Sequence, residues 1–262
     1  MRKYLEFMKV MMKVETAYAA WYWAGTFATV VQLLILYYFW NAVYENRTTI
    51  ADMPLEMMLT YMVIAMLMSE YVSGVGNQLA EDIREGNIAI ELMRPYHLLN
   101  KLVAMDIGFK LSSSLRSALP MFMIAIFFIG IYIPTSIEGW LLFSISAVLG
   151  VLLGAQIDLI IGVVAFWTIN IWGLRVFKEA IIRFFSGALI PISLFPMWFQ
   201  TLSQYLPFQS MVFVPVSIYT GALSGSAAYM AIAIQFGWLV AIFTFVRVIW
   251  ALAVRKVTIF GG

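Results

Sequence analysis

Long stretches of this chain carry no charged side chain. Asp, Glu, Lys and Arg are absent from Thr16 to Tyr44, from Ser117 to Ile137 and from Phe184 to Val246. A helix of about 20 apolar residues crosses the hydrocarbon core of a bilayer. These stretches therefore predict membrane-spanning helices. The composition agrees, because 63% of the residues are hydrophobic, against roughly 45–50% in soluble domains.

The first 15 residues show a different pattern. Arg2, Glu6, Lys9 and Lys13 recur at steps of three or four, which places them on one face of a helix with apolar residues largely opposite. This pattern predicts an amphipathic helix lying in the membrane interface. The apolar run that follows is longer than the roughly 7 to 15 residues of a signal-peptide core, so we expect it to be retained.

Basic residues predict the orientation, since Lys and Arg in short loops stay on the cytoplasmic side. They cluster before the first apolar stretch, between residues 84 and 116, between 175 and 183, and from 247 onwards. With the N-terminus inside, all of the 16 basic residues except Arg47 are cytoplasmic. Each stretch between clusters then crosses the membrane an even number of times. This predicts six spans, with both chain ends in the cytoplasm of a cell that carries the protein in its plasma or inner membrane.

We therefore expect an all-α, multi-pass protein with a single transmembrane domain over residues 1–262. Its predicted parts are an interfacial helix (1–15), spans 1 and 2 (17–76), a charged segment (77–101), spans 3 and 4 (102–174), and spans 5 and 6 (184–252). The expected spans lie near Ala17–Trp40, Met57–Gly76, Leu115–Ile133, Trp140–Trp167 and Tyr229–Trp250, with a short fifth span ending near Pro196.

Four prolines interrupt the last apolar stretch, at Pro191, Pro196, Pro207 and Pro215. Proline removes a backbone donor and breaks the helix that contains it. Residues 197–227 are therefore predicted to form a broken helical hairpin at the outer face. Such a hairpin can dip into the membrane only where other parts of the protein satisfy its backbone.

The charged segment stands out in a chain with only 11% charged residues. Leu79 and Ile83 lie one helical turn apart, and Gly86 is a typical helix stop. A second short helix would pair Ile88 with Leu92 and end before Pro95, since the residue before proline disfavours the helical conformation. We predict a compact bent helix with apolar groups and charges of both signs, which is typical of a docking surface. The plainer alternative is a solvated loop.

The sequence "AEDIREGNIAIELMRPYHLL" resembles the corresponding loop in a subgroup of type 2 ABC transporter permeases. That loop has an acidic residue, Ile, Arg, a spacer and Gly, followed by a short apolar stretch and Leu-x-Arg-Pro. The C-terminal "RKVTIFGG" is also similar to the ends of many such chains. The resemblance implies a permease of the export class, whose loop between spans 2 and 3 is a coupling helix seated in a separate ATPase. The implied contact residues are Glu81, Asp82, Ile83, Arg84, Glu85 and Gly86, with Arg94 and Pro95 closing the surface.

The family resemblance also implies partners. This chain has no G-x-x-x-x-G-K-[ST] phosphate loop, so it is expected to be a transport subunit and not itself an enzyme. ATP and Mg²⁺ would bind the ATPase subunit, and this chain would hold no cofactor or metal of its own. We expect a second permease, with a non-identical partner preferred over a homodimer, and no nucleic-acid partner. The substrate class expected from the aromatic and methionine-rich spans is amphipathic: a drug, lipid or peptide.

Two acidic residues, Glu70 and Asp158, fall within predicted spans. An ionisable group at membrane depth is a functional candidate by default. Either residue could line the transport path. Glu70 could instead form an interhelical hydrogen bond, and Asp158 could pair with a polar group on a neighbouring subunit. The same two residues would serve an ion-coupled secondary transporter, which is the alternative function. An intramembrane enzyme is a weaker alternative, since no second acidic residue forms a recognisable motif with Asp158.

Overall fold

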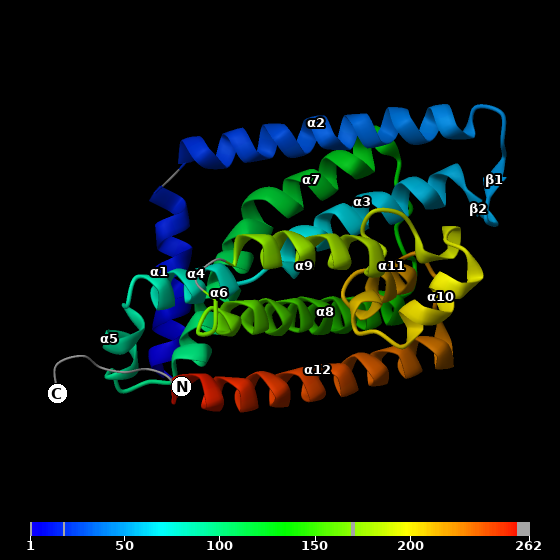
Figure 1. The fold of residues 1–262 in the computed structure, drawn as a ribbon. Coiled ribbons are helices and arrows are strands. Elements are labelled where there is room, and N and C mark those ends of the chain that lie inside the picture. The colour runs from blue at the N-terminus through cyan, green and yellow to red at the C-terminus, as the bar shows by residue number, and fades with distance from the viewer. Residues whose placement is uncertain (1, 18, 169–170, 256–262) are drawn as a thin grey trace.

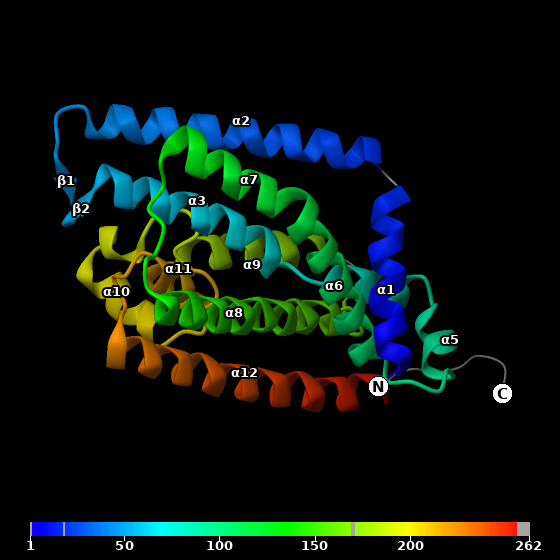
Figure 2. The same cartoon turned by 180° about the vertical axis from the view of Figure 1, so that it is seen from behind.

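The structure is a computed structural model that describes residues 2–17, 19–168 and 171–255. Its long helices lie side by side in one bundle (Figure 1). From one side to the other the order is α2, α3, α9, α8 and α12, and the view from behind shows the same order (Figure 2). The two ends of the bundle carry different elements. The α1 end carries α1, α4 and α5, and the hairpin end carries β1, β2, α10 and α11.

The elements follow one another as short and long helices with one small hairpin. Their bounds in chain order are α1 Arg2–Ala17, α2 Ala19–Tyr44, β1 Thr49–Ile50, β2 Met53–Pro54, α3 Leu55–Val72, α4 Gly76–Arg84, α5 Ile88–Leu92, α6 Leu98–Ser113, the π-helix η1 Ser114–Ala118, α7 Leu119–Ile124, the π-helix η2 Ala125–Ile129, α8 Ile137–Val164, α9 Trp172–Phe185, the 3-10 helix η3 Ile192–Leu194, α10 Met197–Gln204, the 3-10 helix η4 Phe208–Ser210, α11 Phe213–Tyr219 and α12 Gly225–Val254. The two short strands pair antiparallel.

Five helices of the described residues are long and apolar enough to cross a membrane. They are Gly25–Tyr44, Leu55–Arg84, Leu98–Ile129, Ile137–Val164 and Gly225–Val254. They coincide with the predicted spans 1, 2, 3, 4 and 6, so the expectation of a helical, multi-pass membrane protein is confirmed. The third begins well before the predicted Leu115, because α6, η1, α7 and η2 follow one another without a break. It ends at Gly130, which adopts a left-handed conformation (φ 74°).

The predicted position of the fifth span is wrong. Between residues 184 and 196 the helix stops at Phe185, and only a turn and the 3-10 helix η3 follow. The helix that ends there is α9, which starts at Trp172, carries the chain from the α1 end back toward the hairpin end (Figure 1) and is not among the five candidate spans. Its basic residues had suggested a cytoplasmic loop. One of them, Lys178, is instead buried against an acidic partner in the same chain.

The core of the bundle lies around α3 and α8. Most of the middle of α3 is buried, whereas α2 and α12 expose large apolar side chains along much of their length. Helix α8 approaches its neighbours closely through glycines. A Cβ at Gly150 would crowd the carbonyl oxygen of Met211, and one at Gly154 would overlap that of Val72. The small-xxx-small spacing of these two glycines therefore allows close packing of α8.

The segment after α9 is held at the hairpin end by a few specific contacts. The hydroxyl of Tyr61 on α3 donates a hydrogen bond of 2.8 Å to the carbonyl of Gly187, which has a left-handed φ of 77°. The N–H of Phe213 donates to the carbonyl of Ser186 at 2.8 Å. The predicted break-up of residues 197–227 into short helices is present as α10, η4 and α11.

Candidate functional site

The charged segment folds as the predicted pair of short helices. Helix α4 ends at Arg84, Gly86 takes a left-handed φ of 78°, and α5 follows from Ile88 to Leu92. The chain turns at Arg94–Pro95 and enters α6 at Leu98. A side chain at Gly86 would be strained by that backbone conformation although it would meet no neighbour.

Asp158 of α8 organises the start of α4. Its carboxylate Oδ2 accepts hydrogen bonds from the N–H groups of Gly74 (3.1 Å) and Gly76 (2.9 Å), where α3 gives way to α4. Its Oδ1 pairs with the ammonium group of Lys178 on α9. Both side chains are buried, with 3% and 7% exposure. Asp158 thus has a charged partner in its own chain, whereas one of the two alternatives considered for it was a polar group on a neighbouring subunit.

This arrangement ties three elements together. A Cβ at Gly76 would overlap the backbone of Asp158, and one at Gly162 would crowd the backbone of Gly76. Helix α4 therefore lies directly on α8, while the ion pair connects α8 to α9. A displacement of α4 would act on both helices through these contacts.

The apolar side chains of the charged segment divide into two groups. Leu79 and Ile88 are buried in the core of this chain, and Ile83 is half-buried and packs against the same core. Ile90 and Met93 point outward, with exposures of 53% and 72%. Because Leu79 and Ile83 already pack within the chain, the apolar contact available to a partner comes from Ile90 and Met93, which the sequence pattern did not single out.

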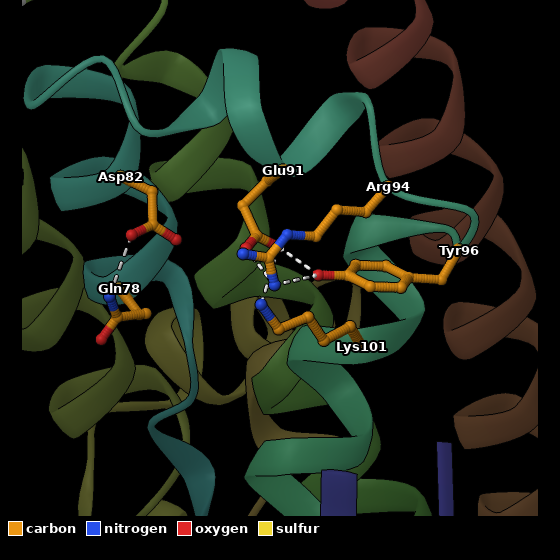
Figure 3. A network of polar contacts seen from close by, with 6 residues as sticks. All are labelled: Gln78, Asp82, Glu91, Arg94, Tyr96 and Lys101. Carbon is orange, nitrogen blue, oxygen red and sulfur yellow. Dashed lines mark hydrogen bonds and ion pairs between the residues drawn. The ribbon is translucent and has the colours of Figure 1, made fainter. Parts of the chain in front are cut away.

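The charged residues at the exposed tip remain largely accessible. Glu81, Arg84 and Glu85 are exposed. Asp82 is half-buried and its Oδ1 accepts a hydrogen bond of 3.1 Å from the side-chain amide of Gln78 (Figure 3). Asn87 donates similarly to Glu85 at 3.1 Å. Of the predicted contact residues from Glu81 to Gly86, the charged ones and Gly86 are thus at least partly accessible, whereas Ile83 packs against the core of this chain.

Glu91 on α5 connects the second half of the charged segment to α6 through polar contacts (Figure 3). Its carboxylate accepts hydrogen bonds from Lys101 at 2.7 Å and from the hydroxyl of Tyr96 at 2.8 Å, and it pairs with Arg94 at 3.6 Å. Burial alone would raise the pKa of Glu91, but the hydrogen bonds from Lys101 and Tyr96, with the charges of Lys101 and Arg94, lower this pKa below its ordinary value of 4.5. Arg94 thus has a structural partner as well as an exposed position.

Helix α1 is fastened to this turn. The hydroxyl of Tyr4 accepts a hydrogen bond of 3.1 Å from the backbone N–H of His97, and Lys3 donates to the carbonyl of Pro95. The ring of Phe7 meets the ring of Tyr96 edge-on at 5.2 Å. Because of these contacts α1 supports the charged segment in addition to presenting a polar face, which is a role that the sequence alone did not reveal.

Glu70 lies apart from this site. It is exposed on α3, and its Oε1 accepts a hydrogen bond of 3.5 Å from the hydroxyl of Thr29 on α2. That contact matches the interhelical alternative considered for this residue. Within the part of the chain that the structure describes, no group of three or more His, Asp or Glu side chains is placed to hold a metal ion.

Several contributors to the site were not identified from the sequence. Their local signals were present but ambiguous, since Glu91, Tyr96 and Lys101 all fall in a charged stretch where many pairings are possible. Lys178 was assigned to a loop because its charge was counted with Arg175 and Arg183. Only the position of α9 beside α8 shows that this lysine faces Asp158.

The chain matches a known family over most of its length. Residues 30–261 match the model of a family described as "ABC-2 family transporter protein", a range that covers the charged segment, most of the first candidate span and the whole of the other four. No curated protein matches the chain.

Proposed function

We propose, from the premise that this chain belongs to the ABC-2 family of transporter proteins, that its charged segment is the contact through which a separate ATPase subunit drives transport. The chain is a membrane-spanning permease subunit of an ABC transporter. ATP and Mg²⁺ would bind on the ATPase subunit, since the chain has no phosphate loop. The direction we propose is export of an amphipathic substrate.

The observation that carries this proposal is the exposed tip of the charged segment. Ile90 and Met93 are exposed apolar side chains, and the exposed charges of Glu81 and Arg84 on the preceding helix α4 and of Glu85 just after it lie nearby in the chain. An apolar centre bordered by charges is typical of protein interfaces. The tip lies at the α1 end, which we assign to the cytoplasm together with both chain ends.

The mechanism follows from how α4 is held. Closure of two ATPase subunits on ATP would push the seated tip, and α4 would transmit that push to α8 through the glycine contacts at Gly76 and Gly162. The Asp158–Lys178 pair would carry it to α9. Packed helices move as rigid bodies more readily than they deform. The movement would open a path between this permease and a second one, which we expect to be non-identical, with a homodimer as the alternative.

Serine substitution at the tip tests the contact. Met93→Ser and Ile90→Ser should reduce co-purification of the ATPase subunit and ATP hydrolysis by the complex about tenfold, because truncation of a central apolar contact typically costs about 1–2 kcal/mol. The ATPase is the subunit that carries a phosphate loop and co-purifies with the tagged wild-type chain. The purified permease alone should hydrolyse no ATP.

Met197→Ser is the matched control. Met197 on α10 is exposed to 74%, nearly the same as Met93, but it lies at the hairpin end. This variant should behave like wild type. If the serine variants at 90 and 93 kept full coupling, or if the permease alone hydrolysed ATP in a preparation free of other ATPases, the proposed function would be rejected.

A further inference from the structure

A pocket of about 450 Å³ lies between α4 and the first turn of α9. It is lined by Asn77, Glu81 and Arg84 from α4 and by Ile171, Trp172 and Arg175 at the start of α9. These two helices meet at the α1 end of the bundle (Figure 1). The pocket shares Glu81 and Arg84 with the charges that border the exposed tip, but neither Ile90 nor Met93 lines it.

The two arginines of this pocket are uncommitted. Arg84 is exposed and Arg175 is half-buried. Among the described residues, neither guanidinium group has a hydrogen bond or an ion pair, and Glu81 has none either. Other cations near this end do have partners, such as Lys101 with Glu91 and Lys178 with Asp158. The pocket therefore concentrates guanidinium donors that the fold itself does not use.

The charges select an anionic group. Two guanidinium groups and one carboxylate leave one net positive charge, and the amide of Asn77 adds a neutral donor. Guanidinium groups bind phosphate oxygens with paired, charge-assisted hydrogen bonds. The carboxylate of Glu81 opposes a second negative charge on the ligand. A singly charged phosphodiester fits this balance better than a doubly charged phosphate ester.

The surroundings favour a lipid over a soluble phosphodiester. Trp172 at the rim is 65% exposed, and Val176, one turn further along the same face of α9, is 45% exposed. Tryptophan is enriched where a bilayer meets water. A headgroup in the pocket would thus leave its acyl chains beside an exposed apolar strip of α9.

We propose that this pocket binds the phosphodiester of an anionic phospholipid, with Arg84 and Arg175 as its cationic partners and Trp172 and Val176 beside the acyl chains. Such a lipid bridges α4 and α9 independently of any ATPase. It therefore holds α4 in its position against α8 and stabilises the isolated permease. Arg84 serves this lipid in addition to its proposed place in the ATPase contact.

The test uses the purified full chain in neutral detergent micelles. Its thermal unfolding is followed while dioleoylphosphatidylglycerol or dioleoylphosphatidylcholine is added, so that the acyl chains are identical and only the headgroup differs. The wild-type Tm should rise with phosphatidylglycerol and stay constant with phosphatidylcholine. Glycerophosphoglycerol, which has the same phosphodiester without acyl chains, should give at most a small rise.

Variants assign the effect to the pocket. R84Q/R175Q should weaken the apparent affinity for phosphatidylglycerol by roughly five- to tenfold for each arginine removed. Glu81→Gln should strengthen it, because it removes the opposing charge. R84K/R175K keeps the charges and should retain part of the affinity. Arg47→Gln removes an exposed arginine at the hairpin end and should change nothing.

The proposal fails on any of three results. One is an equal Tm rise in R84Q/R175Q, which would place the lipid elsewhere. Another is an equal rise with glycerophosphoglycerol, which would indicate a soluble anion. The third is no response to phosphatidylglycerol, as expected if the arginines bind only acidic side chains of the ATPase. If R84Q/R175Q does not fold, Glu81→Gln decides, with Arg47→Gln as the variant expected to match wild type. A weaker or unchanged affinity for phosphatidylglycerol in Glu81→Gln rejects the site. None of these measurements requires the ATPase, so they stand apart from the test of the proposed function.

Discussion

At the scale of single residues, the buried pair of Asp158 and Lys178 fixes how α4 and α9 pack against α8. Two charges removed from water are stable only when they are paired and their remaining hydrogen-bonding atoms are satisfied. Asp158 meets both conditions, since its second oxygen accepts from Gly74 and Gly76. The pair therefore belongs to the scaffold that holds α4 and α9 on α8.

Asp158→Asn should destabilise the folded chain by about 3–5 kcal/mol, because it leaves the charge of Lys178 buried without a partner. Thermal or denaturant unfolding in detergent measures this. The double variant D158N/K178M removes both charges and keeps an oxygen that can accept from Gly74 and Gly76, so it should recover much of the loss. A double variant as unstable as Asp158→Asn would show that the pairing itself is not what stabilises this contact.

Glu91 predicts a pH dependence at the same scale. Its pKa is lowered in the folded chain, so the ionised carboxylate stabilises the fold above its ordinary pKa of 4.5 and this contribution is lost as the pH falls through the lowered value. Glu91→Gln lacks the contribution at every pH. The Tm of wild type should therefore exceed that of this variant by the largest amount near pH 7. The difference should shrink as the pH falls below 4.5. A difference that is constant down to pH 3 would contradict this assignment.

At the scale of elements, α1 depends on one close crossing. A Cβ at Gly108 on α6 would overlap the backbone of Met8, so the two helices can lie together only where this position has no side chain. Tyr4 and Phe7 then reach the turn before α6. The amphipathic pattern of α1 predicted its helix but carried no information about this crossing.

Gly108→Ala should destabilise the protein by about 1–3 kcal/mol, the usual cost of overpacking. Gly237→Ala on α12 is the matched control, because nothing lies within 4 Å of a Cβ there. Alanine has the higher helix propensity, so this control should be neutral or slightly stabilising. The comparison is made by thermal unfolding of both variants. Equal Tm values would show that α1 does not lie against α6 in the purified protein.

At the scale of the whole molecule, the two ends of the bundle differ in chemistry. The α1 end holds the charged segment and its supporting ion pairs, whereas the hairpin end holds β1, β2 and the short helices α10 and α11 (Figure 2). This asymmetry agrees with an orientation in which the α1 end faces the cytoplasm, as the distribution of basic residues predicts.

The orientation can be tested directly, since the natural chain has no cysteine. Asp52→Cys at the hairpin end should react with an impermeant thiol reagent in intact cells. Asn87→Cys between α4 and α5 should react only after the membrane is opened. Both positions are exposed, so accessibility within the protein does not bias the comparison. Labelling of Asn87→Cys in sealed cells would invert the orientation.

The sequence by itself determined the membrane class and most of the helices. A long uncharged stretch in a bilayer can adopt few structures other than a helix, because its backbone must satisfy its own hydrogen bonds there. It also determined the bent form of the charged segment, since Gly86 and Pro95 act on the local backbone. These signals are short-range, so they can be interpreted without knowing which elements are neighbours.

Only the tertiary structure decided which charges belong to the interior and which face outward. The cost of a charge depends on its partner, and the partner of Lys178 is 20 residues away on another helix. The sequence therefore places Lys178 in a cytoplasmic loop, whereas the structure buries it on α9. The same reason applies to Leu79 and Met93. Both are apolar and lie in one segment, yet α8 covers the first, and the second remains exposed because no described element covers it.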